Sequence, residues 1–453
     1  MNRTSALVFL ALGLVASAIA APAAKGGEKL VFGVVSDVHV RGDYPDYLEN
    51  AFAFFRDAGV DAVMLCGDIA NSGRTGELCR AGAAWDAVFP GGKAPDGRTV
   101  EKVFIMGNHD FYDKGPDSNR RNLGGAWRVA FHEEWAPVYS KAVKGYVFIG
   151  AHWGHERETA AFVKANAESL GLRDERPFFY VQHPYPRNTL YFPGRWGDDR
   201  GAVAAAFGSY SNAVVFSGHT HEPLTDERTI WQGAYTAIGA ASLFYIYSSS
   251  SSSCENGSTR KSGPVQQMPP LDFHSGKPCL VVRVFGDRIV CERWDVARGE
   301  KLGPDRVIPL DGSRPFAFEP RVAAVKPPEF PAGASVSLSE ADGVDRRGGK
   351  GRQLTLSFPA APPSATSRVL QYEIRALASR DGVETAVLTN RVFSEAFFLA
   401  PEREPPTGRC VLAVSALPED VEVRFAVRPV ECFGKQGRPI FSNPWRRPAT
   451  AGE

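Results

Sequence analysis

Five apolar segments of this chain each run directly into Asp, Asn or His, and this repeated pattern restricts the folds open to the sequence. The clearest example is 103–106, which is followed by Gly107-Asn108-His109-Asp110. A short apolar run suits a strand of a parallel sheet that is covered on both faces, and a glycine after it lets the backbone turn. Polar residues at the carboxyl ends of such strands meet at one edge of the sheet, where ligands bind in open α/β folds. The pattern therefore predicts an α/β fold with a site at that edge.

The other four segments have the same form. They are 29–35 before Ser36-Asp37-Val38-His39, 60–66 before Gly67-Asp68, 177–182 before His183, and 214–216 before Ser217-Gly218-His219-Thr220-His221. Helical spacing in 44–58 and around 76–88 separates the first three strands, which predicts a βαβαβ start. Taken alone, each polar end also fits an ordinary turn or a structural histidine. Their shared placement at strand ends favours one common site.

These strand-end residues include the groups that bind divalent metal ions in proteins. Imidazole and carboxylate suit zinc, iron, manganese and nickel, and an amide oxygen can complete such a set. The candidate ligands at the strand ends are Asp37, His39, Asp68, Asn108, His109, Asp110, His183, His219 and His221.

The overall charge gives no sign of a large polyanionic partner. The chain has 52 basic and 51 acidic side chains and a net charge of +1. No global field would attract nucleic acid or a membrane surface, so an anionic substrate must be bound by local charge. We therefore expect no nucleic-acid-binding patch.

The seven cysteines are scattered along the chain and odd in number, so they do not predict a disulfide scaffold. A two-residue turn at Gly286-Asp287 would place Cys279 opposite Trp294 and Cys291 opposite Val282, which argues against a direct bridge across that hairpin.

The length of 453 residues suggests a leader and two domains. Arg3 and the apolar run 6–20 are typical of a secretory leader over residues 1–20, so we expect a secreted or periplasmic protein. No later stretch is apolar enough to predict a membrane span. We expect an α/β domain at 27–312, a Pro-rich linker at 313–331 and a second domain at 332–447. Residues 248–267 are of low complexity and predict a mobile surface loop.

The order and spacing of the strand-end motifs resemble the calcineurin-like metallophosphoesterases over residues 30–300. This resemblance implies a four-layer αββα sandwich that holds two divalent or mixed-valence metal ions, of Mn, Fe, Zn or Ni. The first ion would be held by Asp37, His39, Asp68 and His221, and the second by Asp68, Asn108, His183 and His219, with Asp68 bridging the two.

The resemblance also implies an activity. It predicts an exported dimetal phosphoesterase that hydrolyses a phosphodiester by in-line attack of a metal-bridging hydroxide, with His109 as the general acid. Asp110 would orient His109, although a turn or helix-start role fits Asp110 equally well. Purple acid phosphatases carry a Tyr three residues after the bridging Asp, and Asn71 stands there in this chain. That difference favours the phosphodiesterase branch of the family.

Substrate contacts are less sharply defined by the sequence. Asn108, and Arg187 and Arg195 in the loop after His183, are the candidates, because an arginine can bind phosphate with two hydrogen bonds. The alternative is that the two arginines are solvated loop residues. His152 and His155 follow the strand at 145–151, and either line the cleft or serve a structural role.

Two alternative functions remain open. One is a phosphomonoesterase or nucleotidase that uses the same site. The other is a surface binding protein whose phosphoesterase domain is not catalytic, although a domain without activity has no physical reason to keep a converging ligand set.

The second domain shows seven short strands separated by turn signals, which predicts a β-sandwich of immunoglobulin size. Its pattern Leu-Thr-Leu-Ser-Phe-Pro, Tyr-Glu-Ile and Val-Arg-Phe-Ala-Val-Arg-Pro-Val resembles a fibronectin type III module, but Phe358 and Val423 stand where a Trp and a Tyr are usual. No His follows Pro331, so this module is expected to supply no metal ligand. We expect it to contact a cell surface or polymer, and its removal near Arg314 to leave activity on small diesters within a few-fold.

Overall fold

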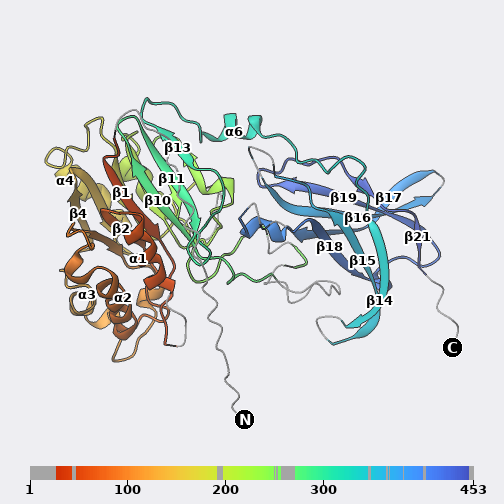
Figure 1. Cartoon of the computed structure of the whole chain (residues 1–453), viewed down its shortest axis with the longest axis horizontal. Coiled ribbons are helices and arrows are strands. Elements are labelled where there is room, and N and C mark those ends of the chain that lie inside the picture. The colour runs from red at the N-terminus through yellow and green to blue at the C-terminus, as the bar shows by residue number, and fades with distance from the viewer. Residues whose placement is uncertain are drawn as a thin grey trace, which may run out of the picture.

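The computed structural model describes residues 27–42, 47–190, 197–248, 250, 254–256, 271–344, 348–363, 366, 368–380, 382–400, 403 and 405–447. The predicted leader and Arg195 lie outside these residues. The described chain forms an α/β part and an all-β part, and α6 (Phe318–Ala324) lies on the segment between them (Figure 1). Within the described residues no helix has the length and apolarity that a membrane span requires.

The first sheet of the α/β part is mixed. Its order is β12-β11-β10-β1-β2-β3, with β13 also paired to β11. β1, β2 and β3 are parallel to one another, and β10 is antiparallel to β1. The strands are β1 (Leu30–Val35), β2 (Ala62–Cys66), β3 (Glu101–Ile105), β10 (Pro278–Val284), β11 (Arg288–Asp295), β12 (Glu300–Lys301) and β13 (Arg306–Pro309).

The second sheet has the order β4-β5-β6-β7-β9-β8. Its four central strands are parallel, and β4 and β8 are antiparallel edge strands. The strands are β4 (Val138–Val143), β5 (Tyr146–Ala151), β6 (Phe178–Val181), β7 (Ala213–Ser217), β8 (Ile230–Gln232) and β9 (Thr236–Gly239).

The two sheets pack face to face and are covered by helices on their outer faces, which gives the four predicted layers. Between the sheets, the Phe32 ring of β1 lies 5.2, 4.7 and 5.7 Å from the rings of Phe148, Phe179 and Phe216. One helical layer packs against the first sheet and the other against the second. The first layer is α1 (Tyr47–Asp57), α2 (Thr75–Val88) and α3 (Leu123–Phe131), and the second is α4 (Thr159–Asn166) and α5 (Ala202–Phe207).

The strand register explains why the polar motifs meet. Val35 of β1 is level with Leu65 of β2, and Cys66 is level with Ile105 of β3. The residues that follow these strands therefore leave the sheet at the same edge. The same holds for β6 and β7, since Val181 is level with Phe216.

The Pro-rich segment predicted as a linker contains a helix, which the prediction missed. α6 includes Pro320 in its first turn. Proline is tolerated there, because the first N–H groups of a helix have no intrahelical acceptor. The short strands β4, β12 and β13 were missed as well, and each of them lies in or beside an edge of its sheet.

The cysteine predictions agree with the structure. Cys279 pairs with Trp294 and Val282 with Cys291 across the β10–β11 hairpin. All seven cysteines lie among the described residues and are free thiols.

The C-terminal part is a sandwich of two antiparallel sheets, β14-β15-β18 and β17-β16-β19-β20, with β21 paired to β19. Its seven predicted strands are all present. Leu354, Leu356 and Phe358 of one sheet pack with Ile374 and Val427 of the other. The strands are β14 (Ser337–Val344), β15 (Lys350–Pro359), β16 (Val369–Arg380), β17 (Val383–Phe393), β18 (Thr407–Ala413), β19 (Glu422–Glu431), β20 (Ile440–Phe441) and β21 (Trp445–Arg446). The fibronectin type III identity of this sandwich stays a prediction.

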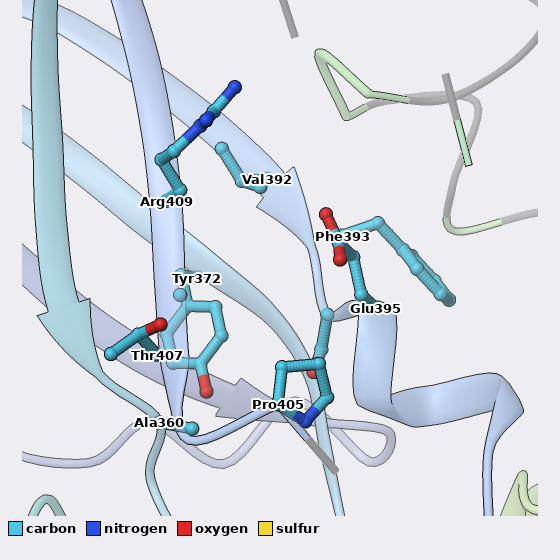
Figure 2. Close-up of a pocket in the computed structure, with 10 residues that line it drawn as sticks. Ala360, Tyr372, Val392, Phe393, Glu395, Pro405, Thr407 and Arg409 are labelled. Carbon is cyan, nitrogen blue, oxygen red and sulfur yellow. The ribbon is translucent and has the colours of Figure 1, made fainter. Parts of the chain in front are cut away.

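A hollow of about 400 Å³ opens between the sheet edges β17 and β18 (Figure 2). Tyr372 forms part of its lining, and its hydroxyl accepts a hydrogen bond from the Ala361 N–H. Glu395 after β17 and Arg409 on β18 also line the hollow. The two edge strands do not pair with each other, so the sandwich is open on this side.

The sandwich binds a short segment of the α/β part, where the sequence predicted a mobile loop. Asn256 exchanges two hydrogen bonds with the backbone of Phe393, at 2.9 and 2.8 Å, and the Glu255 N–H donates to the Arg391 carbonyl at 2.8 Å. Cys254 is buried in an apolar cluster with Phe397 and Phe398. The prediction is therefore wrong for residues 254–256, while 249, 251–253 and 257–267 lie outside the described residues.

Candidate metal centre

The structure brings all seven predicted metal ligands together at the carboxyl edge of the two sheets. Their ligand atoms fall into two groups, each with its atoms within 4.8 Å of one another: Asp37, His39 and His221 in the first, and Asp68, His183 and His219 in the second. Asp68 also groups with His39 and His109. Asp68 therefore lies close to a ligand candidate of each group.

Short contacts join the members of each group. His221 Nε2 lies 3.0 Å from Asp37 Oδ1, and His183 Nε2 lies 3.2 Å from Asp68 Oδ2. The amide oxygen of Asn108 is 3.1 Å from the same His183 nitrogen. Each group contains three of the four residues in one of the two ligand sets that the family resemblance implies.

Five of these residues hold a backbone conformation that side chains disfavour. φ is 49° at Asp37, 52° at His39, 50° at Asp68, 69° at His219 and 55° at His221. The left-handed region costs roughly 1–2 kcal/mol per residue for an L-amino acid. Such residues persist only where their surroundings fix them, and they cluster at functional sites. The fold therefore holds these side chains in place at a cost in backbone strain.

At two positions of the motifs only glycine fits, because the backbone there packs closely against the candidate ligands or a neighbouring side chain. A Cβ on Gly107 would clash with the side chain and backbone N of Asp68, and a Cβ on Gly218 would clash with Ser36 and Asp37. Neither position can take a larger residue without moving a carboxylate, because the clashing atoms belong to buried groups.

Gly107→Ala is expected to lower metal content and to destabilise the fold by about 1–3 kcal/mol, because the added methyl group overpacks the Asp68 loop. Metal analysis and thermal unfolding measure the two effects. Gly124→Ala is the matched control, since a Cβ there meets nothing within 4 Å and the residue lies in α3. That control should be neutral or slightly stabilising. Equal metal content in both variants would contradict the packing argument.

Backbone carbonyls fix two of the imidazoles. His183 Nδ1 donates to the Cys66 carbonyl at 2.7 Å, and His221 Nδ1 donates to the Tyr245 carbonyl at 2.9 Å. This bonding selects the tautomer that leaves Nε2 free as a ligand atom, which is the usual support for a metal-binding histidine.

The residues fit two divalent cations by their chemistry. His39 is only 2% exposed, and neither of its ring nitrogens has a hydrogen-bond partner among the described residues. Burying such a group without a partner is costly, and a cation would supply the partner. Burial opposes protonation of His183, but the carboxylates of Asp68 and Asp37 outweigh it and raise the pKa of His183 to about 10. The two carboxylates therefore favour positive charge at His183.

His109 lies beside the two groups of candidate ligands, and one of its ring nitrogens is hydrogen-bonded to a backbone carbonyl. Its Nδ1 is 2.9 Å from the Asn71 carbonyl, and its backbone N–H donates to Asp68 Oδ1 at 2.8 Å. Its ring is 4.5 Å from that of His39. These contacts direct Nε2 away from Asn71 and leave it available for proton transfer.

The prediction that Asp110 orients His109 needs correction. The fully buried carboxylate of Asp110 accepts hydrogen bonds from the backbone N–H groups of Gly107, Ile69 and Ala70, at 2.7, 3.1 and 2.6 Å. It thus ties the loop after β3 to the loop after β2. The carbonyl of Asn71 is the group that orients His109.

The predicted substrate residues have different positions. Asn108 lies in the centre, and its amide nitrogen donates to the Tyr112 hydroxyl at 2.9 Å. Arg187 binds Asp198 at 3.1 Å and is half exposed, and no described contact links it to a ligand candidate. Its substrate role therefore has no support in these contacts, and Arg195 lies outside the described residues.

The two other histidines near the strand ends are also accounted for. His152 is buried and accepts the Met106 N–H at 3.0 Å, and burial lowers its pKa to about 3. His155 is 2.7 Å from Glu158 on the surface side. His152 is therefore structural.

Sequence reasoning missed four aromatic residues around the centre. The Trp153 ring lies 5.4 Å from His219, Tyr112 lies 4.1 Å from His109, Tyr245 lies 4.2 Å from His221 and Phe244 lies 5.2 Å from His39. Trp153 follows β5 by two residues, so its place after a strand end was a usable signal. Tyr245 and Phe244 follow no strand, and no such signal marked them.

Comparison with protein-family models gives a match in the α/β part of the chain. Residues 30–223 match the family model described as calcineurin-like phosphoesterase. No curated protein matches the chain.

Several solved structures are similar to the chain, but their sequence identities with it are low. A predicted phosphoesterase from Streptococcus pneumoniae is 13% identical with a TM-score of 0.29, and the match covers 62% of this chain and 97% of that one. A purple acid phosphatase from yellow lupin (Lupinus luteus) seeds is 14% identical with a TM-score of 0.38, covering 62% and 53%. Vps29 from Entamoeba histolytica, solved with Zn²⁺, is 9% identical with a TM-score of 0.30, covering 62% and 100%.

Proposed function

We propose that this protein is an exported dimetal phosphodiesterase. The observation that carries the proposal is the buried set of two carboxylates, four imidazoles and one amide, five members of which are held in strained backbone conformations. The family matched by residues 30–223 suggests a metal-dependent phosphoester hydrolase. Two bound divalent ions would lower the pKa of water and neutralise charge on the phosphoryl group.

We assign the general acid role to His109. Its Nδ1–H donates to the Asn71 carbonyl in both protonation states, so Nε2 carries the proton that is gained or lost. That proton goes to the leaving oxygen, and the neutral imidazole that remains keeps its Nδ1–H bond. The contacts of the Asn108 side chain with His183 and Tyr112 support a role in ligand binding at the same edge.

His109→Gln is expected to keep its metals and to lose roughly 10²- to 10⁴-fold in kcat on diesters with poor alkoxide leaving groups, because proton transfer to that oxygen is lost. Nitrophenolate esters should lose far less, since their leaving group scarcely needs a proton. Steady-state kinetics on both substrate types, with metal analysis, checks this. Equal losses on both would assign His109 to a structural role. His155→Gln is a suitable control, because its imidazole binds Glu158 outside the centre.

Asn71 supports diester over monoester hydrolysis, since the tyrosine of purple acid phosphatases is replaced there. The test is a screen of the purified protein against bis(p-nitrophenyl) phosphate, p-nitrophenyl phosphate and nucleotides, with Mn, Fe, Zn and Ni in turn. Diester turnover above monoester turnover is expected. The reverse order would make the protein a phosphomonoesterase or nucleotidase, and no turnover with any metal would favour a binding protein.

Export and an outward contact through the sandwich also belong to this proposal. The leader-like residues 1–20 support export, and the absence of His after Pro331 supports a role for the sandwich other than metal binding. Comparing the N-terminal residue of the mature protein with Met1 tests cleavage of the leader.

A further inference from the structure

A pocket of about 570 Å³ lies where the α/β part, the α6 segment and the sandwich meet. Its lining includes Arg293 of β11, Arg306 of β13, Arg321 of α6 and Arg368 just before β16. Figure 1 shows α6 between the two parts of the chain. No candidate metal ligand lines this pocket, so it is a separate site.

The lining has an excess of positive charge. Three guanidinium groups share one carboxylate: Glu227 lies 2.7 Å from Arg293, 2.7 Å from Arg321 and 3.9 Å from Arg306. Burial opposes ionisation of Glu227, yet Arg293, Arg306 and Arg321 lower its pKa to about 2. A single carboxylate cannot balance three cations, so the cluster attracts a further anion.

The remaining charges of the lining do not restore the balance. The second carboxylate, Asp305, binds Lys301 at 2.8 Å. Arg314 is exposed on the lining, and no hydrogen bond or ion pair of its side chain occurs with the residues that the structure describes. It therefore adds an uncompensated cation at the rim.

Arg306 gives an independent indication of a missing ligand, because two of its buried nitrogen donors lack a hydrogen-bond acceptor among the described residues. It is only 2% exposed, and its Nη2 donates to the carbonyls of Leu224 and Asp226 at 3.2 and 2.8 Å. Its Nε and Nη1 have no acceptor anywhere in the described chain. Burial, and then the neighbouring Arg293, lower the pKa of Arg306 to about 9. Unpaired buried donors on a cation are costly, and a nearby anion offsets that cost.

The apolar residues of the lining indicate the chemistry of the rest of the ligand. Pro304, Pro315, Phe316 and Pro320 contribute apolar surface beside the arginines. A volume of this size is typical of pockets for small organic molecules. Arginine forks match phosphoryl oxygens, and a phosphate monoester carries nearly two negative charges at neutral pH.

We propose that this pocket binds the phosphate monoester of a small organic molecule, with the phosphoryl group at the arginine cluster and the organic group against the proline and phenylalanine wall. The site does not depend on the proposed catalytic function. If that function holds, hydrolysis of a diester releases a phosphate monoester. The product of the reaction would then belong to the class of molecule that this second site binds.

The test measures binding stoichiometry on the full-length, metal-loaded protein. Phenylphosphonate serves as the probe, because it has the aromatic group and the dianion but no ester bond to be hydrolysed. Isothermal titration should show two sites per chain, one at the metal centre and one at the pocket. Arg314→Glu should weaken one site by about tenfold or more, because a charge-assisted contact is replaced by repulsion, while kcat on a small diester stays unchanged.

Two further variants show whether the second site is this pocket. Arg438→Glu reverses an exposed charge on the sandwich that is paired with Glu329, and it should leave both sites intact. Arg321→Gln, which keeps the side chain's polarity inside the pocket, should weaken the same site as Arg314→Glu. A wild type without any site that Arg314→Glu and Arg321→Gln weaken, whether it binds one or two molecules of the probe, would overturn the proposal. Equally tight binding of inorganic phosphate would overturn the assignment of an organic phosphate. A protein inactive on every ester that still shows the arginine-dependent site would overturn the proposed function alone.

Discussion

Replacing Asp68 with Asn is expected to remove metal and activity together. Asp68 belongs to two of the three ligand groups, and its carboxylate also accepts the His109 N–H. The amide keeps the shape of the side chain but loses the negative charge that would balance two bound cations. Because losing only a supporting residue behind a metal ligand costs roughly 10- to 100-fold, losing this shared ligand should cost more than that in kcat/KM.

Metal analysis by mass spectrometry and steady-state kinetics on the same preparation measure both effects. Asp287→Asn is the control, since Asp287 is an exposed turn residue whose carboxylate binds Arg288 alone among the described residues. A variant at Asp68 that kept two metals per chain and most of its rate would show that the carboxylate does not bridge. Loss of metal from the control as well would point to general instability of the fold.

The sequence was sufficient to predict that these candidate ligands lie close together, because the signal is local. Each of Asp37, Asp68, Asn108, His183 and His219 follows a buried strand within a few residues, and parallel strands of one sheet must end at the same edge. A strand that is recognised by its apolar run therefore also places the residue after it. The same logic placed Cys279 opposite Trp294, because a two-residue turn fixes the register of a hairpin.

The sequence was not sufficient where a role depends on contacts between distant segments. Asp110 is adjacent to His109, yet its carboxylate binds the N–H groups of Ile69 and Ala70, about forty positions earlier. No periodicity reveals which backbone groups a buried carboxylate will meet. The arginine cluster is a further case, since Glu227, Arg293, Arg306 and Arg321 come from four separate segments.

Contacts between distant segments also change the role that we expect for the sandwich. The absence of His after Pro331 indicated a module that stands apart from the chemistry. The structure instead packs it on the segment that supports His221. The Tyr245 carbonyl accepts from His221 Nδ1 at 2.9 Å, and the Tyr247 N–H donates to the His221 carbonyl at 2.8 Å. Between them, the buried Ile246 lies in one apolar cluster with Phe397 and Phe398 of the sandwich.

Truncation after Gly312 is therefore expected to lower kcat on a small diester by well over the few-fold change that the sequence suggested. Removing the sandwich exposes Ile246, Cys254 and Phe273 to water and frees the segment that orients His221. Loss of a supporting contact behind a metal ligand costs roughly 10- to 100-fold in metal affinity or activity. A soluble truncated protein that kept its metals and a kcat within a few-fold would support independence of the two parts.

Point variants separate this effect from simple unfolding. Phe397→Ala and Phe358→Ala each remove a buried ring and should each cost about 3–5 kcal/mol in the free energy of unfolding. Phe397 packs at the contact with Ile246, whereas Phe358 packs inside the sandwich against Tyr372. Measured at a temperature where both variants are folded, metal affinity and kcat should fall in Phe397→Ala and stay near wild type in Phe358→Ala. Equal activity in the two variants would mean that the sandwich contributes stability to the chain but does not position His221.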